Sequence, residues 1–305
     1  AVASYQIFMA EALRRYNIDP GFSPGKVGAF LIGFQERTVT YPTVMAGWNG
    51  AGFAKLNLNP SEWPTPESAA HFLNTFRPPL LTGDPISFSE LLRLPLEYSP
   101  RALISTSLAM SGPLKTELET RLRTKVIDWY SLTETGPIGY AALDGHGFQV
   151  LPHDLFIETL DESGHPAAPG ERGEITVTGG RNPFIPLLRY RTGDWARLEG
   201  SRVLDLEGRK PLYFKTHTRK RINTVDISRV LRDFPIVQHE MVQKSDLSCD
   251  LRIRPASTGI QMHHVRAALE KLFDGNPGFD ISVDETLGHR TGKVLPYQTE
   301  LLMEE

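Results

Sequence analysis

The sequence predicts an α/β fold. We expect a doubly wound lobe with a mixed sheet and a small antiparallel β subdomain, followed by a small α+β C-terminal domain. Between residues 27 and 130, short apolar runs alternate with helical segments, which is typical of a parallel sheet covered by helices. From about residue 148 the segments indicate half-buried antiparallel strands. After residue 211 the pattern changes again, to a basic cluster followed by a mixture of helices and strands.

The elements of the first 130 residues follow from their periodicity. Residues 4–15 have apolar side chains at helical spacing, and VGAFLIGF (27–34) is an apolar run of the length of a buried strand. A long polar and glycine-containing stretch, residues 35–60, is assigned no element. Beyond it we expect helices over 67–76, 87–94 and 114–124, and strands over 80–83, 102–110 and 125–130.

The second half divides into two regions. We expect strands within 148–161 and 173–179, and a strand pair over 187–200 that turns at Thr192-Gly193-Asp194. A boundary near Arg209 to Pro211 predicts two domains, 1–208, incomplete at its start, and 209–305. The second domain should contain helices over 225–234 and 262–273 and strands over 236–243, 249–255 and 279–285.

Composition excludes several functional classes. The chain has 305 residues, 40% of them apolar, which is enough for a large core. A net charge of −3 argues against a sequence-blind nucleic-acid binder. A single cysteine, Cys249, makes neither a disulfide framework nor a thiolate metal site, which favours an intracellular, cytoplasmic protein. No apolar run approaches the roughly 18 residues of a membrane helix, so no membrane partner is expected.

Four short signals stand in a fixed order along the chain. They are Tyr130-Ser131-Leu132-Thr133-Glu134, Arg189-Tyr190-Arg191-Thr192-Gly193-Asp194, Gly208-Arg209 and Thr291-Gly292-Lys293. Their separations are 60 residues (134 to 194), 15 residues (194 to 209) and 84 residues (209 to 293). Each signal alone is weak, and the ordered set is specific.

Together these signals resemble the adenylate-forming superfamily of acyl-CoA synthetases, peptide-synthetase adenylation domains and luciferases. The runs LPHDLFIETLD, GERGEITVT and IPLLRYRTGD are most similar to the phenylacetate-CoA ligase branch, and the resemblance covers roughly residues 1 to 300. It implies activation of a carboxylic acid by ATP to an acyl-adenylate, with Mg²⁺ and release of pyrophosphate. A biosynthetic member that activates an aromatic acid, for example in phenazine antibiotic formation, is one reading within this branch.

The resemblance assigns roles to residues of the first domain. Tyr130 would stack on adenine, Thr133 would donate a hydrogen bond to the α-phosphate, and Glu134 would hold Mg²⁺, which prefers oxygen ligands. Asp194 would accept hydrogen bonds from the ribose hydroxyls, since a carboxylate offers two acceptor oxygens. Asp128 would lie near the adenine. The alternatives are a core tyrosine, a solvated loop carboxylate and an ordinary turn aspartate.

The resemblance also assigns roles to two cations. Arg209 would reach phosphate or ribose with its fork of donors. Lys293 would meet the acyl carboxylate, the ribose ring oxygen and the phosphate, delivered by closure of the small domain. The alternative for Lys293 is a surface lysine.

Three departures from the family pattern concern the other parts of the reaction. The Ser-, Thr- and Gly-rich phosphate loop is absent, and we expect it upstream of Ala1 in a longer parent protein. Gly208-Arg209-Lys210-Pro211 stands where the family usually has Gly-Arg-x-Asp, and Pro211 should hinder rotation at this hinge. Thr218 is the nearest match to a glycine that lines the pantetheine path in the family, and a side chain there should narrow this path. The basic run Arg219-Lys220-Arg221 would either meet CoA phosphates or form a solvated face.

The departures at Pro211 and Thr218 both affect the thioester step, so they favour acyl-adenylate formation over thioester formation, and the use of CoA stays open. The downstream acceptor would be CoA, a carrier protein or an amine. Candidates for the acid pocket suit an aryl acid more than a fatty chain, and they are Tyr41, Trp48, Phe53, Met110 and Ile138. The alternatives are a complete aryl-CoA ligase and a non-catalytic binding module on the same fold.

Overall fold

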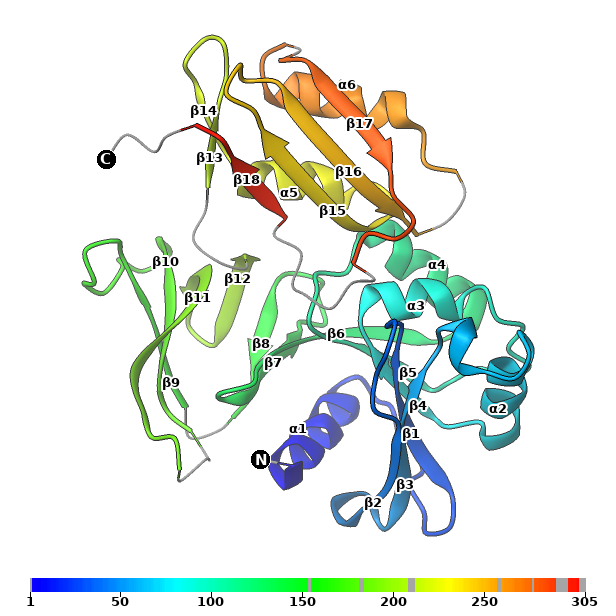
Figure 1. Ribbon diagram of the computed structural model, residues 1–305. Coiled ribbons are helices and arrows are strands. Elements are labelled where there is room, and N and C mark those ends of the chain that lie inside the picture. The colour runs from blue at the N-terminus through cyan, green and yellow to red at the C-terminus, as the bar shows by residue number, and fades with distance from the viewer. Residues whose placement is uncertain are drawn as a thin grey trace.

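A computed structural model describes residues 2–152, 155–180, 184–207, 212–256, 259–275, 277–288 and 296–301. Within these ranges the strands form a twelve-stranded sheet, a four-stranded sheet and a two-stranded ribbon. The twelve-stranded sheet belongs to residues 2–207, here called the N-terminal lobe, and the smaller sheets to residues 212–301, the C-terminal lobe. Figure 1 shows the C-terminal lobe above the N-terminal lobe, over α3.

The first half of the large sheet is doubly wound, as predicted. Its order is β2-β3-β1-β4-β5-β6, in which β3, β1, β4, β5 and β6 run parallel and β2 is antiparallel. Helix α1 covers one face, while α2, α3 and α4 cover the other (Figure 1). The elements are α1 (Val2–Arg15), β1 (Val27–Gly33), β2 (Tyr41–Met45), η1 (Ala46–Trp48), β3 (Ala51–Asn57), η2 (Pro60–Glu62), α2 (Ser68–Phe76), β4 (Leu80–Gly83), α3 (Pro85–Leu91), β5 (Ala102–Ser105), α4 (Gly112–Leu122) and β6 (Lys125–Leu132).

Alternate residues of the central strands face the two helical layers. Leu81 and Leu103 point into the cluster under α2, α3 and α4, and Leu80 and Ile104 point into the cluster under α1. Both sets are completely buried. Strands buried on both faces read as continuous apolar runs, which is why the sequence pattern locates them.

The second half of the large sheet is antiparallel. Its order, β6-β7-β8-β12-β11-β10-β9, curls around a core formed by Tyr130, Ile138, Ile175, Val177, Ala196 and Val203. The strands are β7 (Gly136–Ala141), β8 (Phe148–Val150), β9 (Leu155–Leu160), β10 (Arg172–Gly179), β11 (Leu187–Glu199) and β12 (Arg202–Glu207).

The C-terminal lobe is α+β, as predicted. Its four-stranded sheet has the order β17-β16-β15-β18 and packs on α5 and α6 around Met241, Leu251 and Leu269. Its elements are β13 (Tyr213–Lys215), β14 (Arg221–Asn223), α5 (Thr224–Arg232), β15 (Ile236–Gln243), β16 (Cys249–Pro255), α6 (Met262–Leu272), β17 (Phe279–Val283) and β18 (Tyr297–Thr299). No helix in the described ranges is both long and apolar enough to cross a membrane.

Three expectations about elements were wrong. The polar stretch 35–60 contains β2 and β3, which extend the parallel sheet at its edge. The strand expected over 102–110 ends at Ser105. The strand pair expected over 187–200 is the single strand β11, because Gly193, at φ +81°, produces an irregularity in the β10–β11 register instead of a reversal. The expected domain boundary, 208–211, lies outside the described residues.

We predict that Leu103→Ala destabilises the N-terminal lobe by about 3 kcal/mol, because it removes a fully buried side chain from a packed core. Urea unfolding followed by tryptophan fluorescence measures the change. The matched control is Leu188→Ala on β11, where the side chain is 83% exposed, and we expect a change within about 0.5 kcal/mol. Equal effects of the two substitutions would contradict the assignment of the core.

Candidate functional site

Two of the four sequence signals meet in the structure through a crossed pair of hydrogen bonds. The hydroxyl of Tyr130 on β6 donates to Asp194 Oδ2 on β11, at 2.9 Å. The hydroxyl of Tyr190 on β11 donates to Glu134 Oε1 in the turn between β6 and β7, also at 2.9 Å. Each segment therefore supplies one tyrosine and one carboxylate. Residues separated by about 60 positions in the chain form one polar cluster.

Local backbone features hold this cluster in place. Gly136, at φ +74°, ends the turn that carries Thr133 and Glu134. On β11, Thr192 donates its hydroxyl hydrogen to the carbonyl of Ile175 at 2.8 Å and accepts a hydrogen bond from the amide of Asp194 at 3.1 Å. These bonds fix the backbone that carries Asp194.

Glu174 on β10 supports the same bulge from the neighbouring strand. Its Oε1 accepts the Gly193 amide at 3.0 Å, and its Oε2 accepts from Arg191 Nε at 2.6 Å. The carboxylate is only 8% exposed. This role of Glu174 was not predicted, since the run Gly-Glu-Ile-Thr-Val-Thr indicated a strand and a family resemblance but no single functional residue.

Tyr130 is a core side chain in this structure. It is 6% exposed and packs with Ile138 and Val177. Burial, and then the charge of Asp194, raise the pKa of its hydroxyl far above the usual range, so the tyrosine stays protonated and donates. The structure thus shows a tyrosine that orients Asp194, while stacking of Tyr130 on adenine stays a prediction.

Thr133 and Glu134 are exposed at the tip of the turn. The hydrogen bond to Glu134 is the main reason that the pKa of Tyr190 is raised. Tyr190 belongs to the second signal, but the resemblance assigns it no role. Its place in the same run of polar residues as Asp194 was the feature of the sequence that could have indicated one. The described residues contain no cluster of three or more His, Cys, Asp or Glu side chains that could hold a metal without other ligands.

Asp128 lies on β6 two residues before Tyr130, at the last position that pairs with β5. Burial raises the pKa of this carboxyl to about 6, although the Trp129 amide donates to it at 3.1 Å and the charges of Lys115 and Arg232 oppose the shift. Arg232 belongs to α5 of the C-terminal lobe. Charges of both lobes therefore act on the Asp128 carboxyl, and its pKa of about 6 lies above the usual value.

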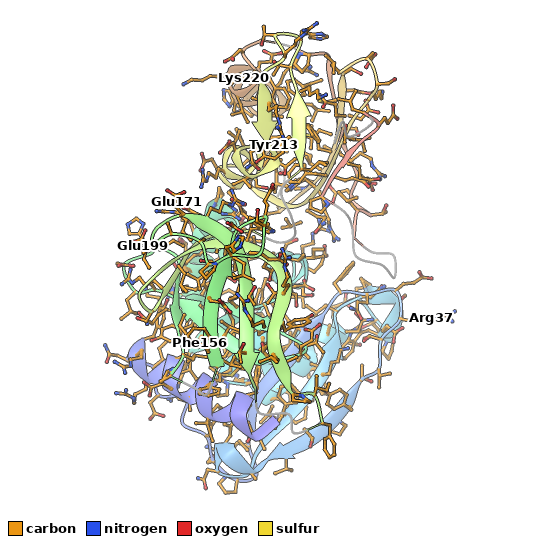
Figure 2. The ribbon with its side chains drawn as sticks, turned by 90° about the vertical axis from the view of Figure 1, so that its left-hand side faces the viewer. Arg37, Phe156, Glu171, Glu199, Tyr213 and Lys220 are labelled. Atoms are coloured by element: carbon orange, nitrogen blue, oxygen red, sulfur yellow. The ribbon has the colours of Figure 1, made fainter. Side chains whose placement is uncertain are left out.

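The remaining two signals and the basic run follow the cluster in the sequence, between residues 208 and 293. Arg209, Pro211 and Lys293 lie outside the described residues. Thr218 is in the β13–β14 turn, where its hydroxyl lies 2.8 Å from that of Thr216. Two side chains of the basic run have partners within the C-terminal lobe, where Figure 2 labels Lys220 and Tyr213. Lys220 pairs with Asp274 at 2.8 Å, and Arg221 lies over the ring of Tyr213.

The five candidates for the acid pocket lie on different parts of the N-terminal lobe. Trp48 is 3% exposed and stacks on Phe22 at 4.6 Å, in the cluster beneath α1 that also borders Phe53. Ile138 is completely buried in the β subdomain, and Met110 packs on the cluster under α3. Tyr41, 43% exposed on edge strand β2, lies 6.3 Å from the ring of Phe53. Trp48 and Ile138 are core side chains in this structure, and a role of the five residues in an acid pocket stays a prediction.

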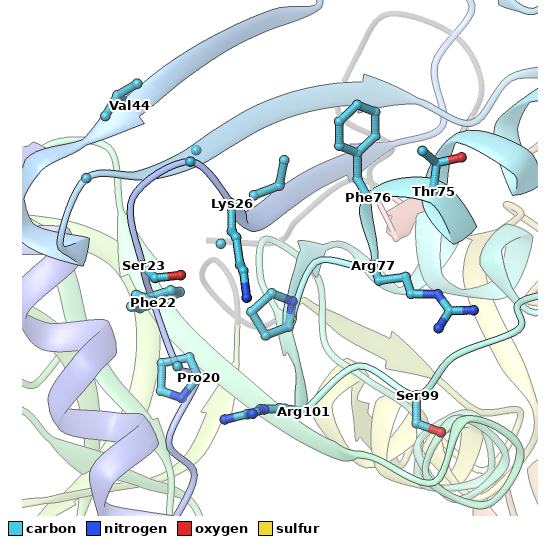
Figure 3. Close-up of a pocket in the computed structure, with 17 residues that line it drawn as sticks. Pro20, Phe22, Ser23, Lys26, Val44, Thr75, Phe76, Arg77, Ser99 and Arg101 are labelled. Carbon is cyan, nitrogen blue, oxygen red and sulfur yellow. The ribbon is translucent and has the colours of Figure 1, made fainter.

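A separate hollow of about 560 Å³ lies at the amino ends of β1, β4 and β5 (Figure 3). Lys26, Arg77 and Arg101 line it, with small loop residues between them. Ligands of doubly wound sheets bind at the carboxyl ends of strands, where Ser105 and Asp128 lie. This basic hollow is therefore on the opposite edge from the candidate site.

No model of a known protein family matches the chain. A chalcone synthase of Aspergillus candidus, cfoA, is 28% identical over an alignment of 159 residues that covers 43% of this chain and 6% of that protein. Solved acid–CoA ligases match over most of the chain. A 2-hydroxyisobutyryl-CoA ligase in complex with an acyl-AMP superposes with a TM-score of 0.65 at 14% identity, over 96% of this chain and 69% of the ligase.

Two ligases for aromatic acids match similarly. The anthranilate CoA ligase AuaEII, in complex with anthranoyl-AMP, has a TM-score of 0.59 at 13% identity, over 85% of this chain and 56% of that one. A benzoate CoA ligase from Burkholderia xenovorans has a TM-score of 0.60 at 14% identity, over 92% and 62%. The chain thus has the fold of the adenylate-forming acid–CoA ligases, and it spans about six tenths of the length of these two.

We predict that Asp128→Asn stabilises the protein at pH 8 and not at pH 4. A carboxyl whose pKa rises to about 6 on folding contributes stability that is present below about pH 4 and is lost as the pH rises through 6. Removing the charge should therefore add up to about 3 kcal/mol at pH 8. Denaturant unfolding across this pH range measures it.

The control is Asp144→Asn, where an exposed carboxylate is paired with Arg202 and has a lowered pKa. This substitution should have the opposite sign and a small effect. A pH-independent effect of Asp128→Asn would contradict the assignment of the raised pKa.

Proposed function

We propose that the protein activates an aromatic carboxylic acid with ATP, forming the acyl-adenylate and releasing pyrophosphate. The observation that carries the proposal is the crossed pair of tyrosine–carboxylate hydrogen bonds, which brings Glu134 and Asp194 to one cluster on a fold shared with acid–CoA ligases. Asp128, with its raised pKa, lies on the same strand as Tyr130, where β6 stops pairing with β5. Support for an aromatic acid comes from the anthranilate and benzoate ligases among the structural neighbours.

Asp194 would accept hydrogen bonds from the two ribose hydroxyls. Tyr130 would hold this carboxylate in one orientation, since its protonated hydroxyl donates to Oδ2 at 2.9 Å. Thr133, in the exposed turn, would donate to the α-phosphate. Positioning of two anions and neutralisation of their charge are the main requirements of such a phosphoryl transfer.

The residues present fit Mg²⁺ as a nucleotide-bound ion. Glu134 offers an exposed carboxylate oriented by Tyr190, and Mg²⁺ is commonly bound by one or two carboxylates together with phosphates and water. When bound, the ion would neutralise phosphate oxygens during displacement. Arg209 and Lys293 would complete the set of cations.

We predict that the full-length protein catalyses ATP–pyrophosphate exchange that depends on an aromatic acid such as benzoate or anthranilate. Asp194→Asn should lower the exchange rate about 100-fold, because one charge-assisted acceptor for the ribose is lost. Tyr190→Phe should lower it about 10-fold, through disorder of Glu134. Asp144→Asn, in an exposed ion pair remote from β11 in sequence, is the matched control and should retain the wild-type rate.

A non-catalytic binding module is the alternative from another class. Calorimetry with ATP and Mg²⁺ separates the two: Glu134→Ala should weaken ATP binding at least tenfold only in the presence of Mg²⁺. Binding without exchange for any acid would favour the module. Consumption of CoA with thioester formation would identify the complete ligase.

A further inference from the structure

A nearly buried ion pair joins the two lobes. Arg254 on β16 is 1% exposed, and its Nη2 donates to Oε1 of Glu90 on α3 at 2.8 Å. Glu90 is 8% exposed. The Nη1 of Arg254 donates to the carbonyl of Leu287 at 3.3 Å. The pair thus connects the helix layer of the N-terminal lobe with the sheet of the C-terminal lobe.

The pair is part of a chain of four alternating charges. Arg93, at the end of α3, lies 3.4 Å from Glu90 Oε2 and 3.5 Å from Glu285 Oε2. Glu90 and Arg93 belong to the N-terminal lobe, and Arg254 and Glu285 to the C-terminal lobe. The contacts therefore cross the interface twice, once buried and once at its exposed rim.

Apolar groups exclude water around the buried pair. Val237 and Ala256 of the C-terminal lobe belong to the same core cluster as Ile86 of α3. The guanidinium of Arg254 lies 5.4 Å from the ring centre of Phe34. Gly288, at φ +84°, lies close to α3, and a Cβ at this position would come within 2.9 Å of Ile86 Cδ1 and displace the end of that side chain.

Because both charges are buried, this contact favours one position of the C-terminal lobe along α3, here called its register. A buried ion pair gains little net stability, because desolvation of both ions opposes their attraction, but leaving one ion buried without its partner is strongly unfavourable. A lobe that slid along α3 would bury an unpaired charge. The observed position of the C-terminal lobe on α3 is therefore defined by the ion pair as well as by apolar contact.

We propose that Glu90 and Arg254 are positioning residues that set the register of the C-terminal lobe on α3 and so place this lobe at the acid-activating site. In this register Arg232 donates to the carbonyl of Leu206 at 3.5 Å, and its charge acts on Asp128. The consequence for catalysis rests on the proposed function, in which Lys293, from the same part of the sequence, would act as a cation at the acid-activating site.

The test measures geometry and activity separately. Spin labels at Thr120→Cys on α4 and Lys271→Cys on α6, both exposed positions, report the distance between the lobes by pulsed electron resonance, and the native Cys249 is buried. Glu90→Gln and Arg254→Met should each broaden or shift the wild-type distance distribution. They should lower kcat of exchange at least tenfold with KM for ATP changed less than twofold.

Two further variants keep the outcome decisive. Glu90→Leu with Arg254→Met should restore a compact distribution, because an apolar pair leaves no unpaired charge at the interface. Glu117→Gln, which removes an ion pair within α4, is the matched control and should change neither distance nor rate. Circular dichroism verifies that each variant is folded.

An unchanged distance distribution in both single variants would overturn the proposal, as would a double variant as open as the single ones. Altered distances with an unchanged kcat would overturn the link to catalysis. A wild-type protein without exchange for any acid would count against the proposed function alone, and the distances would still decide the role of the pair.

Discussion

The pairing of β6 with two different neighbours is the constraint on which the candidate site depends. Its first four residues form a parallel ladder with β5, and its last four form an antiparallel ladder with β7. Asp128 is the last residue of the parallel part and Trp129 the first of the antiparallel part. The chain therefore leaves the doubly wound sheet at the place where the polar residues gather, at the carboxyl ends of its strands.

The antiparallel half supplies the second wall of this site. Because β11 lies within the same continuous sheet, the bulge at Gly193 and the turn at Gly136 are held by neighbouring strands. Two tyrosine hydroxyls then bridge the walls, each to a carboxylate of the opposite segment. The pKa values of both tyrosines are raised, so their hydroxyls stay protonated and orient the carboxylates as neutral donors.

The C-terminal lobe reaches the site through electrostatics as well as through packing. Burial raises the pKa of Asp128, and the charge of Arg232 opposes this rise. Arg254 holds the C-terminal lobe against α3 through its ion pair with Glu90. Both arginines lie on elements that the sequence predicted correctly as a helix and a strand. Their partners across the interface are in the N-terminal lobe, more than 100 residues away in the chain (104 from 128 to 232, 164 from 90 to 254), and no local pattern connects them.

The sequence by itself determined the α/β class, the positions of the buried strands and the order of the four signals, because apolar periodicity and turn residues act locally. It did not reveal β2 and β3, whose polar and glycine-rich residues suit an edge of the sheet, or the uninterrupted course of β11. Only the tertiary structure decided that Trp48 and Ile138 are core residues, that Tyr130 and Tyr190 orient carboxylates, and that Glu90 meets Arg254. These facts depend on which segments distant in the chain pack together, and burial then decides whether an aromatic ring or a charge is available to a ligand.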